Sequence, residues 1–293
     1  MVILIKDAFD ESLPLKLASF GEVTSDESRL KEADVLLIRS KTKCTREFLS
    51  GLDKLKVIIR GGVGMDNIDK EACKEKGIIA LNTPKSSAIA VAELAFSLML
   101  SIPNNIVFYD NTMKKGEWNK KTKRHELYGK TLALLGYGHI PREMSKRAKA
   151  FGMNVVAYDK YLTEADVPLL PSMEDAVRNA DYISMHLPLT DETRKVMGDA
   201  LIGAMERKPV VINTGRGGCV DEDAMAKALA DGRVSWFATD VYSSEPPAKE
   251  NPILSSEHVT LTPHVGANSV ENLARISDEV VETIKRLIEE KKI

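Results

Sequence analysis

Residues 131–141 read Thr131-Leu-Ala-Leu-Leu-Gly136-Tyr137-Gly138-His139-Ile140-Pro141, an apolar run followed by the pattern G-x-G-x-x-P. The run is typical of a buried strand, and the residues after Gly138 are typical of a helix start. A glycine at the first position allows a tight turn. A glycine at the second lets backbone N–H groups approach a phosphate at a helix N-terminus. The pattern therefore predicts a dinucleotide-binding turn in which residues 136–140 contact the cofactor.

Pro141 stands where this turn usually has a third glycine, which permits close packing of the helix on the strand. Proline is tolerated in the first turn of a helix because its missing N–H would lack a partner there anyway. We expect the helix to form, slightly displaced. The competing interpretation of the turn is a chance pair of glycines in a surface loop.

A carboxylate follows at a suitable distance from the turn. Asp159 ends a second apolar run, Val155–Tyr158, and lies 159 − 136 = 23 residues beyond Gly136. A carboxylate about 20 residues after the first glycine commonly binds the ribose hydroxyls. Because an acidic residue repels a 2′-phosphate, Asp159 favours NAD(H) over NADP(H). The neighbouring Lys160 weakens that preference, and Asp159 could instead be a surface residue.

Short Val/Ile/Leu runs alternate with helical patterns along nearly the whole chain. Continuous apolar runs are typical of strands buried on both faces of a parallel sheet, and the alternation predicts an α/β fold. The runs form two series, so we expect two α/β domains. The predicted strands are Val2–Ile5, Val35–Ile38, Val57–Ile59, Ile78–Leu81, Leu132–Leu135, Val155–Tyr158, Tyr182–Met185, Val210–Ile212, Trp236–Thr239 and Val259–Leu261.

Two helices are predicted outside this alternation. Residues 89–115, rich in Ala, Leu and Met, predict one long helix between the two series of strands. Its apolar residues indicate a structural core helix or, as a second interpretation, a subunit interface. Residues 269–292 predict an amphipathic helix after the last strand.

The bulk composition excludes several classes of protein. The 293 residues are 43% hydrophobic and 29% charged with a formal net charge of −2, so we expect no nucleic-acid or acidic-membrane partner. No segment reaches the roughly 20 apolar residues of a membrane helix, and the N-terminus resembles a strand rather than a signal peptide. The three cysteines stand apart with no metal-binding spacing, so we predict no metal, reduced thiols and a cytoplasmic location.

Taken together, the motifs resemble the D-isomer-specific 2-hydroxyacid dehydrogenases along nearly the whole chain. That resemblance implies two Rossmann-like parallel-sheet domains, one flavodoxin-like and one NAD-binding, with a cleft between them. The NAD-binding domain, residues 90–266, would be inserted in a substrate domain of residues 1–89 and 267–293. A homodimer through the long inter-domain helix is also implied. The matching motifs are Arg60-Gly-Gly-Val-Gly64-Met-Asp66, Asn82-Thr-Pro84, Asn213-Thr-Gly-Arg216-Gly217, Asp240-Val-Tyr242, Glu245-Pro246 and Thr262-Pro263-His264.

Within the family, Leu37–Thr45 and Arg60 look most like phosphoglycerate dehydrogenases of serine biosynthesis. Val63 departs from the threonine common there, and we expect no C-terminal regulatory extension and no amino-acid feedback control. A glyoxylate or hydroxypyruvate reductase is the alternative. Lys85-Ser86-Ser87 replaces the family's usual Gly-x-Asn, which would alter substrate choice or simply face water.

The resemblance assigns three catalytic residues. His264 would be the acid/base, because an imidazole exchanges protons near neutral pH. Glu245 would bond its other ring nitrogen, fixing its orientation and favouring its protonated form. Arg216 would hold the substrate carboxylate with its planar donors. In isolation each has a structural alternative: a satisfied core histidine, a solvent-facing glutamate and a surface arginine.

The resemblance also assigns substrate and cofactor contacts. The N–H groups of Val63 and Gly64 would complete the carboxylate site, and Arg60 would bind a substrate phosphate or form a salt bridge at a strand end. On the cofactor side the implied contacts are His186, Pro188, Thr214, Gly215 and Asp240, the last of which could equally be a capping residue.

Two alternative functions stand beside a 2-hydroxyacid dehydrogenase. One is a non-enzymatic NAD-sensing scaffold of the corepressor type, and the other is an oxidoreductase that acts on formate or phosphite.

Overall fold

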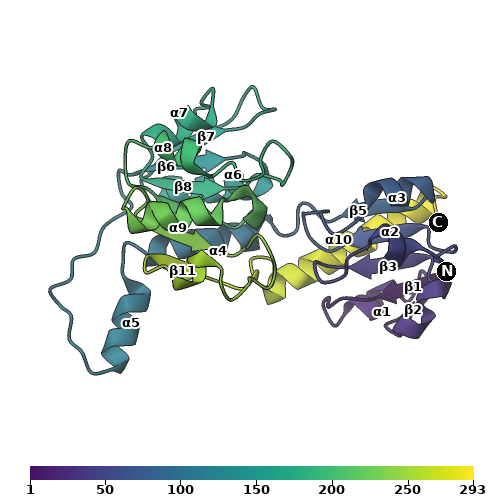
Figure 1. The fold of residues 1–293 in the computed structure, drawn as a ribbon. Helices are drawn as coiled ribbons and strands as arrows, with labels where there is room; N and C mark the ends of the chain where they lie inside the picture. The colour runs from purple at the N-terminus through teal and green to yellow at the C-terminus, as the bar shows by residue number, and fades with distance from the viewer. The chain divides into compact units, whose positions relative to one another are not determined.

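The computed structural model describes residues 1–293, which divide into two compact units (Figure 1). Unit 1 comprises Met1–Ala90 with Ala267–Ile293, and unit 2 comprises Val91–Gly266. Each unit contains one sheet of parallel strands with helices on both faces. The predicted α/β class with two parallel sheets is confirmed.

The sheet of unit 1 has the strand order β2-β1-β3-β4-β5, in which every neighbouring pair is parallel. This is the flavodoxin-like order. The strands are β1 (Val2–Ile5), β2 (Glu22–Thr24), β3 (Val35–Ile38), β4 (Val57–Arg60) and β5 (Ile79–Asn82). β2 was not predicted, because Val23 is the one apolar residue of this short edge strand.

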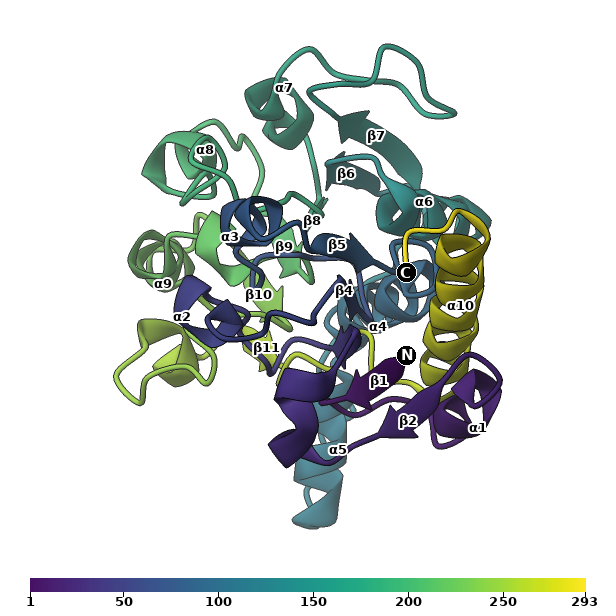
Figure 2. The ribbon, with the colours of Figure 1, turned by 90° about the vertical axis from the view of Figure 1, so that its right-hand side faces the viewer.

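Both faces of this sheet are covered, since alternate strand residues point to opposite sides. Leu4, Leu36 and Ile58 pack toward α2 (Arg46–Leu49) and α3 (Lys70–Glu75). Ile3, Val35 and Ile59 pack toward α1 (Leu13–Leu17) and α10 (Val270–Glu289), which lie side by side (Figure 2). A 3-10 helix, η1 (Glu27–Glu32), precedes β3. The C-terminal helix is therefore part of the core of unit 1.

The sheet of unit 2 has the order β11-β10-β9-β8-β6-β7, again parallel throughout. An isolated parallel β-bridge between Ala157 of β7 and Leu169 extends this edge of the sheet by one residue. From β6 the chain runs to β7 on one side and returns to β8 on the other, so the strand order reverses between β6 and β8. Open α/β sheets bind ligands at such a point. The strands are β6 (Thr131–Leu135), β7 (Asn154–Tyr158), β8 (Tyr182–Met185), β9 (Val210–Asn213), β10 (Trp236–Thr239) and β11 (Val259–Leu261).

Helices cover both faces of this sheet as well. α4 (Ala88–Ser101) and α6 (His139–Ala150) share a core cluster with Leu132, Leu134 and Ile212. On the other face α7 (Met173–Arg178), α8 (Asp199–Gly203) and α9 (Glu222–Ala230) share a cluster with Leu135, Ile183 and Val211. Two 3-10 helices, η2 (Gly217–Cys219) and η3 (Pro252–Ser255), complete the unit.

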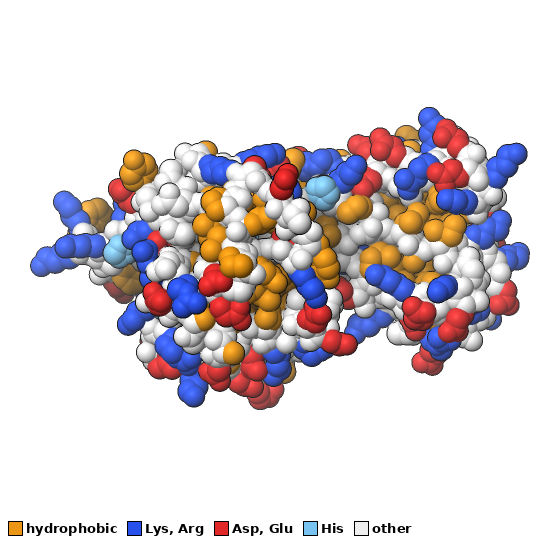
Figure 3. Space-filling view, turned by 90° about the horizontal axis from the view of Figure 1, so that it is seen from above, with side chains coloured by type: hydrophobic (Ala, Val, Ile, Leu, Met, Phe, Trp, Pro, Cys, Tyr) orange, Lys and Arg blue, Asp and Glu red, His pale blue; other side chains and the backbone are white.

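The prediction of one long helix over residues 89–115 is wrong. The segment forms α4 and a separate α5 (Ile106–Lys114), bent by 65°. Pro103 interrupts the hydrogen-bonding pattern, and Asn105, at φ 53°, adopts the left-handed conformation that asparagine tolerates. α5 projects from the rest of unit 2 (Figure 1), in a segment rich in Lys and Arg side chains (Figure 3, left end).

No single helix of the chain is both long and apolar enough to cross a membrane. Taken together, the bent pair α4–α5 has the length and apolar composition of a membrane-spanning segment, but α4 is mostly buried in the core of unit 2.

Candidate active site

The Gly136–Gly138 turn lies at the carboxyl end of β6, where the strand order reverses. Gly136 has φ +87°, and a Cβ there would lie 2.8 Å from the backbone oxygen of His186 at the end of β8. Both the conformation and the space therefore require glycine. The Gly136 N–H donates to the Tyr158 carbonyl at 2.8 Å, which ties the turn to β7.

Helix α6 begins at His139 directly after this turn. Gly138 is its N-cap, so no side chain accepts from the first-turn N–H groups, and a Cβ on Gly138 would meet nothing within 4 Å. Pro141 is buried in the first turn and does not prevent the helix from forming. The exposed N-terminus of α6 is thus an opening with backbone donors aimed at it, which suits a phosphate group.

The side chain of Tyr137 points away from this opening. It is 1% exposed, its hydroxyl donates to Asp166 Oδ1 at 2.7 Å, and Arg142 lies 4.8 Å from its ring centroid. Burial raises the pKa of Tyr137. Its contribution to the turn is therefore its backbone rather than its phenol.

Asp159 lies at the carboxyl end of β7 and is held by backbone donors. Its Oδ2 accepts from Tyr137 N at 2.8 Å, and its Oδ1 accepts from Tyr161 N at 2.9 Å and Leu162 N at 3.2 Å. Lys160 forms its salt bridge with Glu192 at 2.5 Å, not with Asp159. The carboxylate is thus fixed beside the glycine turn.

Two buried polar atoms beyond β8 and β9 have no hydrogen-bond partner: His186 Nδ1 and Thr214 Oγ1. His186 Nε2 pairs with Ser184 Oγ at 2.9 Å, and burial lowers the pKa of His186 to about 3, which leaves the ring neutral. Gly215 brings the Thr214 loop against β8, since a Cβ on it would lie 3.1 Å from the Met185 oxygen. Unpartnered buried polar atoms are costly, and a bound ligand with polar groups would satisfy them. Pro188 is exposed nearby in the chain, and its carbonyl accepts from Thr193 Oγ1 at 2.5 Å.

These features fit a dinucleotide. The glycine turn, the uncapped helix, the fixed carboxylate and the two orphaned polar atoms follow neighbouring strands at one edge of the sheet. The residues that would hold NAD are therefore the backbone of residues 136–140 at the pyrophosphate and Asp159 at the ribose. His186 and Thr214 supply further polar groups.

His264 and Glu245 form a pair at the same edge. His264 Nδ1 lies 2.6 Å from Glu245 Oε2, and both side chains are partly exposed. The other ring nitrogen of His264, Nε2, makes no hydrogen bond within the structure. His264 has φ +55°, an uncommon conformation for a residue other than glycine. The ring is thus oriented by one nitrogen and offers the other to a ligand.

The charge of Glu245 is stabilised locally. Burial acts to raise its pKa, but the hydrogen bond and charge of His264, the Tyr242 N–H and the charge of Arg216 outweigh it. The result is a pKa below the ordinary 4.5, so Glu245 is a carboxylate at neutral pH.

Arg216 follows β9, and its loop packs directly on the one that carries Glu245. A Cβ on Gly217 would lie 2.0 Å from the carbonyl carbon and 2.1 Å from the oxygen of Tyr242. Asn213 Nδ2 donates to the Arg216 carbonyl at 3.0 Å, and Arg216 Nη1 donates to the Gly215 carbonyl at 2.8 Å. The three predicted catalytic residues therefore occupy adjoining loops of unit 2.

Asp240 anchors the loop that carries His264. It is 1% exposed and accepts from Thr262 Oγ1 at 2.6 Å, Val265 N at 2.9 Å and Gly266 N at 2.8 Å. Its contacts within the structure are thus those of a capping residue, one of the two roles expected from the sequence.

The predicted substrate contacts lie in unit 1: Arg60 is the last residue of β4, and Val63 and Gly64 are in the loop that follows. Gly62, at φ +141°, leaves room for Arg60, because a Cβ there would lie 2.8 Å from Arg60 Nη1. Val63 is 39% exposed, and its carbonyl accepts from Asn82 at 2.5 Å. Val63 and Gly64 follow in the same loop.

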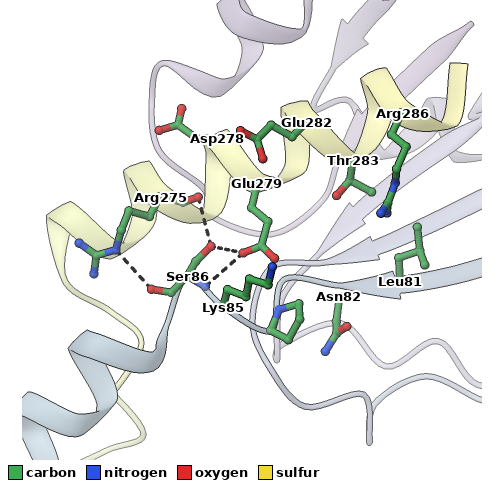
Figure 4. Close-up of a pocket in the computed structure, with 11 residues that line it drawn as sticks. Leu81, Asn82, Lys85, Ser86, Arg275, Asp278, Glu279, Glu282, Thr283 and Arg286 are labelled. Carbon is green, nitrogen blue, oxygen red and sulfur yellow. Dashed lines mark hydrogen bonds between the residues drawn. The ribbon is translucent and has the colours of Figure 1, made fainter. Parts of the chain in front are cut away.

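The segment Lys85-Ser86-Ser87 holds α10 in place (Figure 4). The Ser86 N–H donates to Glu279 at 3.1 Å, the Ser86 hydroxyl also bonds that carboxylate, and Arg275 Nε donates to the Ser86 carbonyl at 3.3 Å. Lys85 is exposed. A cavity of about 730 Å³ lies between this segment and α10, and none of the predicted site residues line it.

Comparison with known proteins agrees with this geometry. Residues 96–266, more than half of the chain, match the family model described as D-isomer specific 2-hydroxyacid dehydrogenase, NAD binding domain. The D-3-phosphoglycerate dehydrogenase of Methanocaldococcus jannaschii is 42% identical over 300 residues, covering 98% of this chain and 57% of that protein. The hydroxypyruvate reductase of Thermotoga maritima is 42% identical over 259 residues, covering 87% of this chain and 85% of that protein.

A solved structure extends the likeness to the fold. The crystal structure of the D-lactate dehydrogenase of Aquifex aeolicus, complexed with NAD and lactic acid, matches with a TM-score of 0.86 at 27% identity, covering 100% of this chain and 97% of that chain. The chain spans about half the length of the phosphoglycerate dehydrogenases it matches. The chain belongs to the D-isomer specific 2-hydroxyacid dehydrogenases, a family of NAD-dependent oxidoreductases, and its residues 96–266 form the NAD-binding domain of that family.

Proposed function

We propose that this chain transfers a hydride between NAD(H) and C2 of a small D-2-hydroxy or 2-oxo acid. The observation that carries the proposal is the His264–Glu245 pair, with an Nδ1–Oε2 distance of 2.6 Å, at the sheet edge that also bears the Gly136–Gly138 turn. Histidine is the side chain that most often serves as a positioned general acid or base, and here a carboxylate fixes its ring.

The chain's own residues supply the rest of the reaction. When bound, NADH provides the hydride. His264 Nε2, which has no partner within the structure, holds the proton that the substrate oxygen receives on reduction and accepts it on oxidation. Glu245 fixes the ring through Nδ1. Arg216 presents a planar set of N–H donors that matches a carboxylate, and so orients the 2-oxo acid.

The preferred substrate is 3-phosphoglycerate and its keto product, phosphohydroxypyruvate. Support comes from the relatives named D-3-phosphoglycerate dehydrogenase and from Arg60, whose guanidinium suits a phosphate. The N–H groups of Val63 and Gly64 would receive the substrate carboxylate.

A hydroxypyruvate or glyoxylate reductase is the second candidate. It is favoured by the hydroxypyruvate reductase relative and by a structural neighbour named as a glyoxylate reductase, which has a TM-score of 0.88 at 28% identity. Val63 agrees with it as well, because phosphoglycerate dehydrogenases often have threonine there.

Two experiments test the proposal. A spectrophotometric panel of NADH and NADPH against phosphohydroxypyruvate, hydroxypyruvate, glyoxylate and pyruvate identifies the substrate and the cofactor. If the protein reduces none of these four acids, the proposed function is contradicted. His264→Ala should lower kcat by about 10² to 10⁴ while NADH still binds, since general acid–base catalysis typically contributes that much. Unchanged turnover would remove the mechanism.

Arg60→Ala separates the two candidates. If Arg60 binds a substrate phosphate, the change should impair reduction of phosphohydroxypyruvate far more than that of glyoxylate, which has no phosphate to bind. Equal losses in kcat/KM on the two substrates would reject the phosphate role.

We also propose a homodimer in which α5 packs on a second copy. Val107 is 56% and Phe108 is 44% exposed on this helix, which has only nine residues. Isolated helices shorter than about 12–15 residues are marginal in water, so α5 needs a packing partner. Phe108→Glu should convert the dimer to a monomer in size-exclusion chromatography with light scattering. Leu15→Glu, which changes an 82% exposed leucine in unit 1, should not.

A further inference from the structure

Tyr242, three residues beyond β10, lies in the loop that carries Glu245 and contacts the loops that carry Arg216 and His264. Its main chain fills the space beside Gly217, where a Cβ would lie 2.0 Å from the Tyr242 carbonyl carbon. Its N–H donates to Glu245 Oε1 at 3.2 Å. Its hydroxyl donates to the Thr262 carbonyl at 3.0 Å, two residues before His264.

The loop around His264 needs such support. His264 has φ +55°, and a non-glycine residue keeps this conformation only where its surroundings impose it. Asp240 binds the Thr262 side chain, Val265 N and Gly266 N from the end of β10. The Tyr242 hydroxyl adds a bond to the main chain on the amino-terminal side of His264.

The environment of Tyr242 favours this bond. Tyr242 is 9% exposed, and burial raises its pKa, so the hydroxyl is a proton donor at neutral pH. Because the aromatic ring of Tyr242 is rigid, its hydroxyl oxygen cannot shift as the end of a flexible side chain can. The bond therefore fixes the distance between β10 and the loop after β11.

We infer that Tyr242 is a positioning residue for the catalytic centre: its hydroxyl holds the loop that presents His264, and its main chain sets the spacing between the Arg216 loop and Glu245. This inference rests on the proposed function, because the consequence of misplacing His264 is lost proton transfer.

Tyr242→Phe removes the hydroxyl and keeps the ring. We expect kcat for reduction of the 2-oxo acid to fall by about three- to tenfold, since a typical neutral hydrogen bond contributes about that factor. The KM for NADH should stay within about twofold, because the contacts of the cofactor turn do not include Tyr242. Tyr182→Phe is the matched control. Tyr182 is also buried in unit 2 but lies at the amino end of β8, so its loss should leave kcat unchanged.

A double-mutant cycle distinguishes positioning from a general structural effect. If Tyr242 acts through His264, adding Tyr242→Phe to His264→Ala should lower kcat no further. Tyr242→Phe at wild-type kcat, or the same fold-loss with and without His264, would overturn the inference alone. Wild-type turnover by His264→Ala would instead overturn the proposed mechanism, and the positioning role with it.

Discussion

Gly217→Ala should separate the two loops that hold Arg216 and Glu245. The new methyl carbon would lie 2.0 Å from the carbonyl carbon and 2.1 Å from the oxygen of Tyr242, whereas ordinary contacts of a Cβ begin at 3.4 Å. The required separation is 3.4 − 2.0 = 1.4 Å. Because the opposing atoms are backbone, no side-chain rotation relieves the contact.

The displacement sets the size of the effect. A misplacement of about 1 Å at a catalytic group can cost about 10²-fold, so we expect kcat/KM to fall by about that factor. Overpacking typically lowers the free energy of unfolding by about 1–3 kcal/mol, which leaves the protein folded at 25 °C. Binding of NADH should persist, because the close contacts of a Cβ at Gly217 are with Tyr242 and not with the Gly136–Gly138 turn or Asp159.

Gly218→Ala provides the matched control, one residue along the same turn. A Cβ on Gly218 would lie 3.0 and 3.1 Å from the two terminal carbons of Leu189, which can move by rotation. We therefore expect kcat/KM within about threefold of wild type. Steady-state rates of NADH oxidation measure both variants. Wild-type kcat/KM in Gly217→Ala, or an equal loss in Gly218→Ala, would refute the steric reasoning.

Three further predictions concern charge and hydrogen bonding. Asp159→Ala should reduce the preference for NADH over NADPH in kcat/KM, because the repulsion of a 2′-phosphate is removed; equal losses with both cofactors would contradict that role. Ser86→Ala should lower the free energy of unfolding in urea by about 1.5–3 kcal/mol, the range for hydrogen bonds to a charged group, while Lys85→Ala should change it by less than about 0.5 kcal/mol. Glu245 has a folded-state pKa below its ordinary 4.5, so its carboxylate stabilises the fold above that pH and loses the contribution as pH falls through the folded-state value. The difference in unfolding free energy between wild type and Glu245→Gln should therefore be largest near neutral pH and shrink below pH 4.5; a difference independent of pH would reject this coupling.

Strands buried on both faces could be predicted from the sequence because their apolar residues are continuous. β3 and β8 have no exposed positions, and both were located to the residue. β2 could not be predicted in this way, because a short edge strand buries little. The break between α4 and α5 had a local signal in Pro103 and Asn105, but the apolar content of the flanking residues concealed it.

The candidate site was predictable only in part, for a physical reason. Residues next to a strand end, such as Asp159 after β7, can be placed because their position in the sheet follows from the chain. The contact of Gly217 with Tyr242 cannot, because the two lie 242 − 217 = 25 residues apart and meet only once their strands pair. The need for glycine at position 217 comes from that meeting and not from the turn that contains it.

The order of the strands accounts for how the three loops come together. β9 pairs with β10, and β10 pairs with β11, all parallel, so the loops after them leave the sheet side by side. Such adjacency places Arg216, Glu245 and His264 in neighbouring loops but leaves each loop free to shift. Two residues after the central strand limit that freedom: Asp240 binds the loop after β11, and Tyr242 contacts the loops on both sides. The accuracy of the site thus depends on the end of β10 more than on the three side chains that would carry out the chemistry.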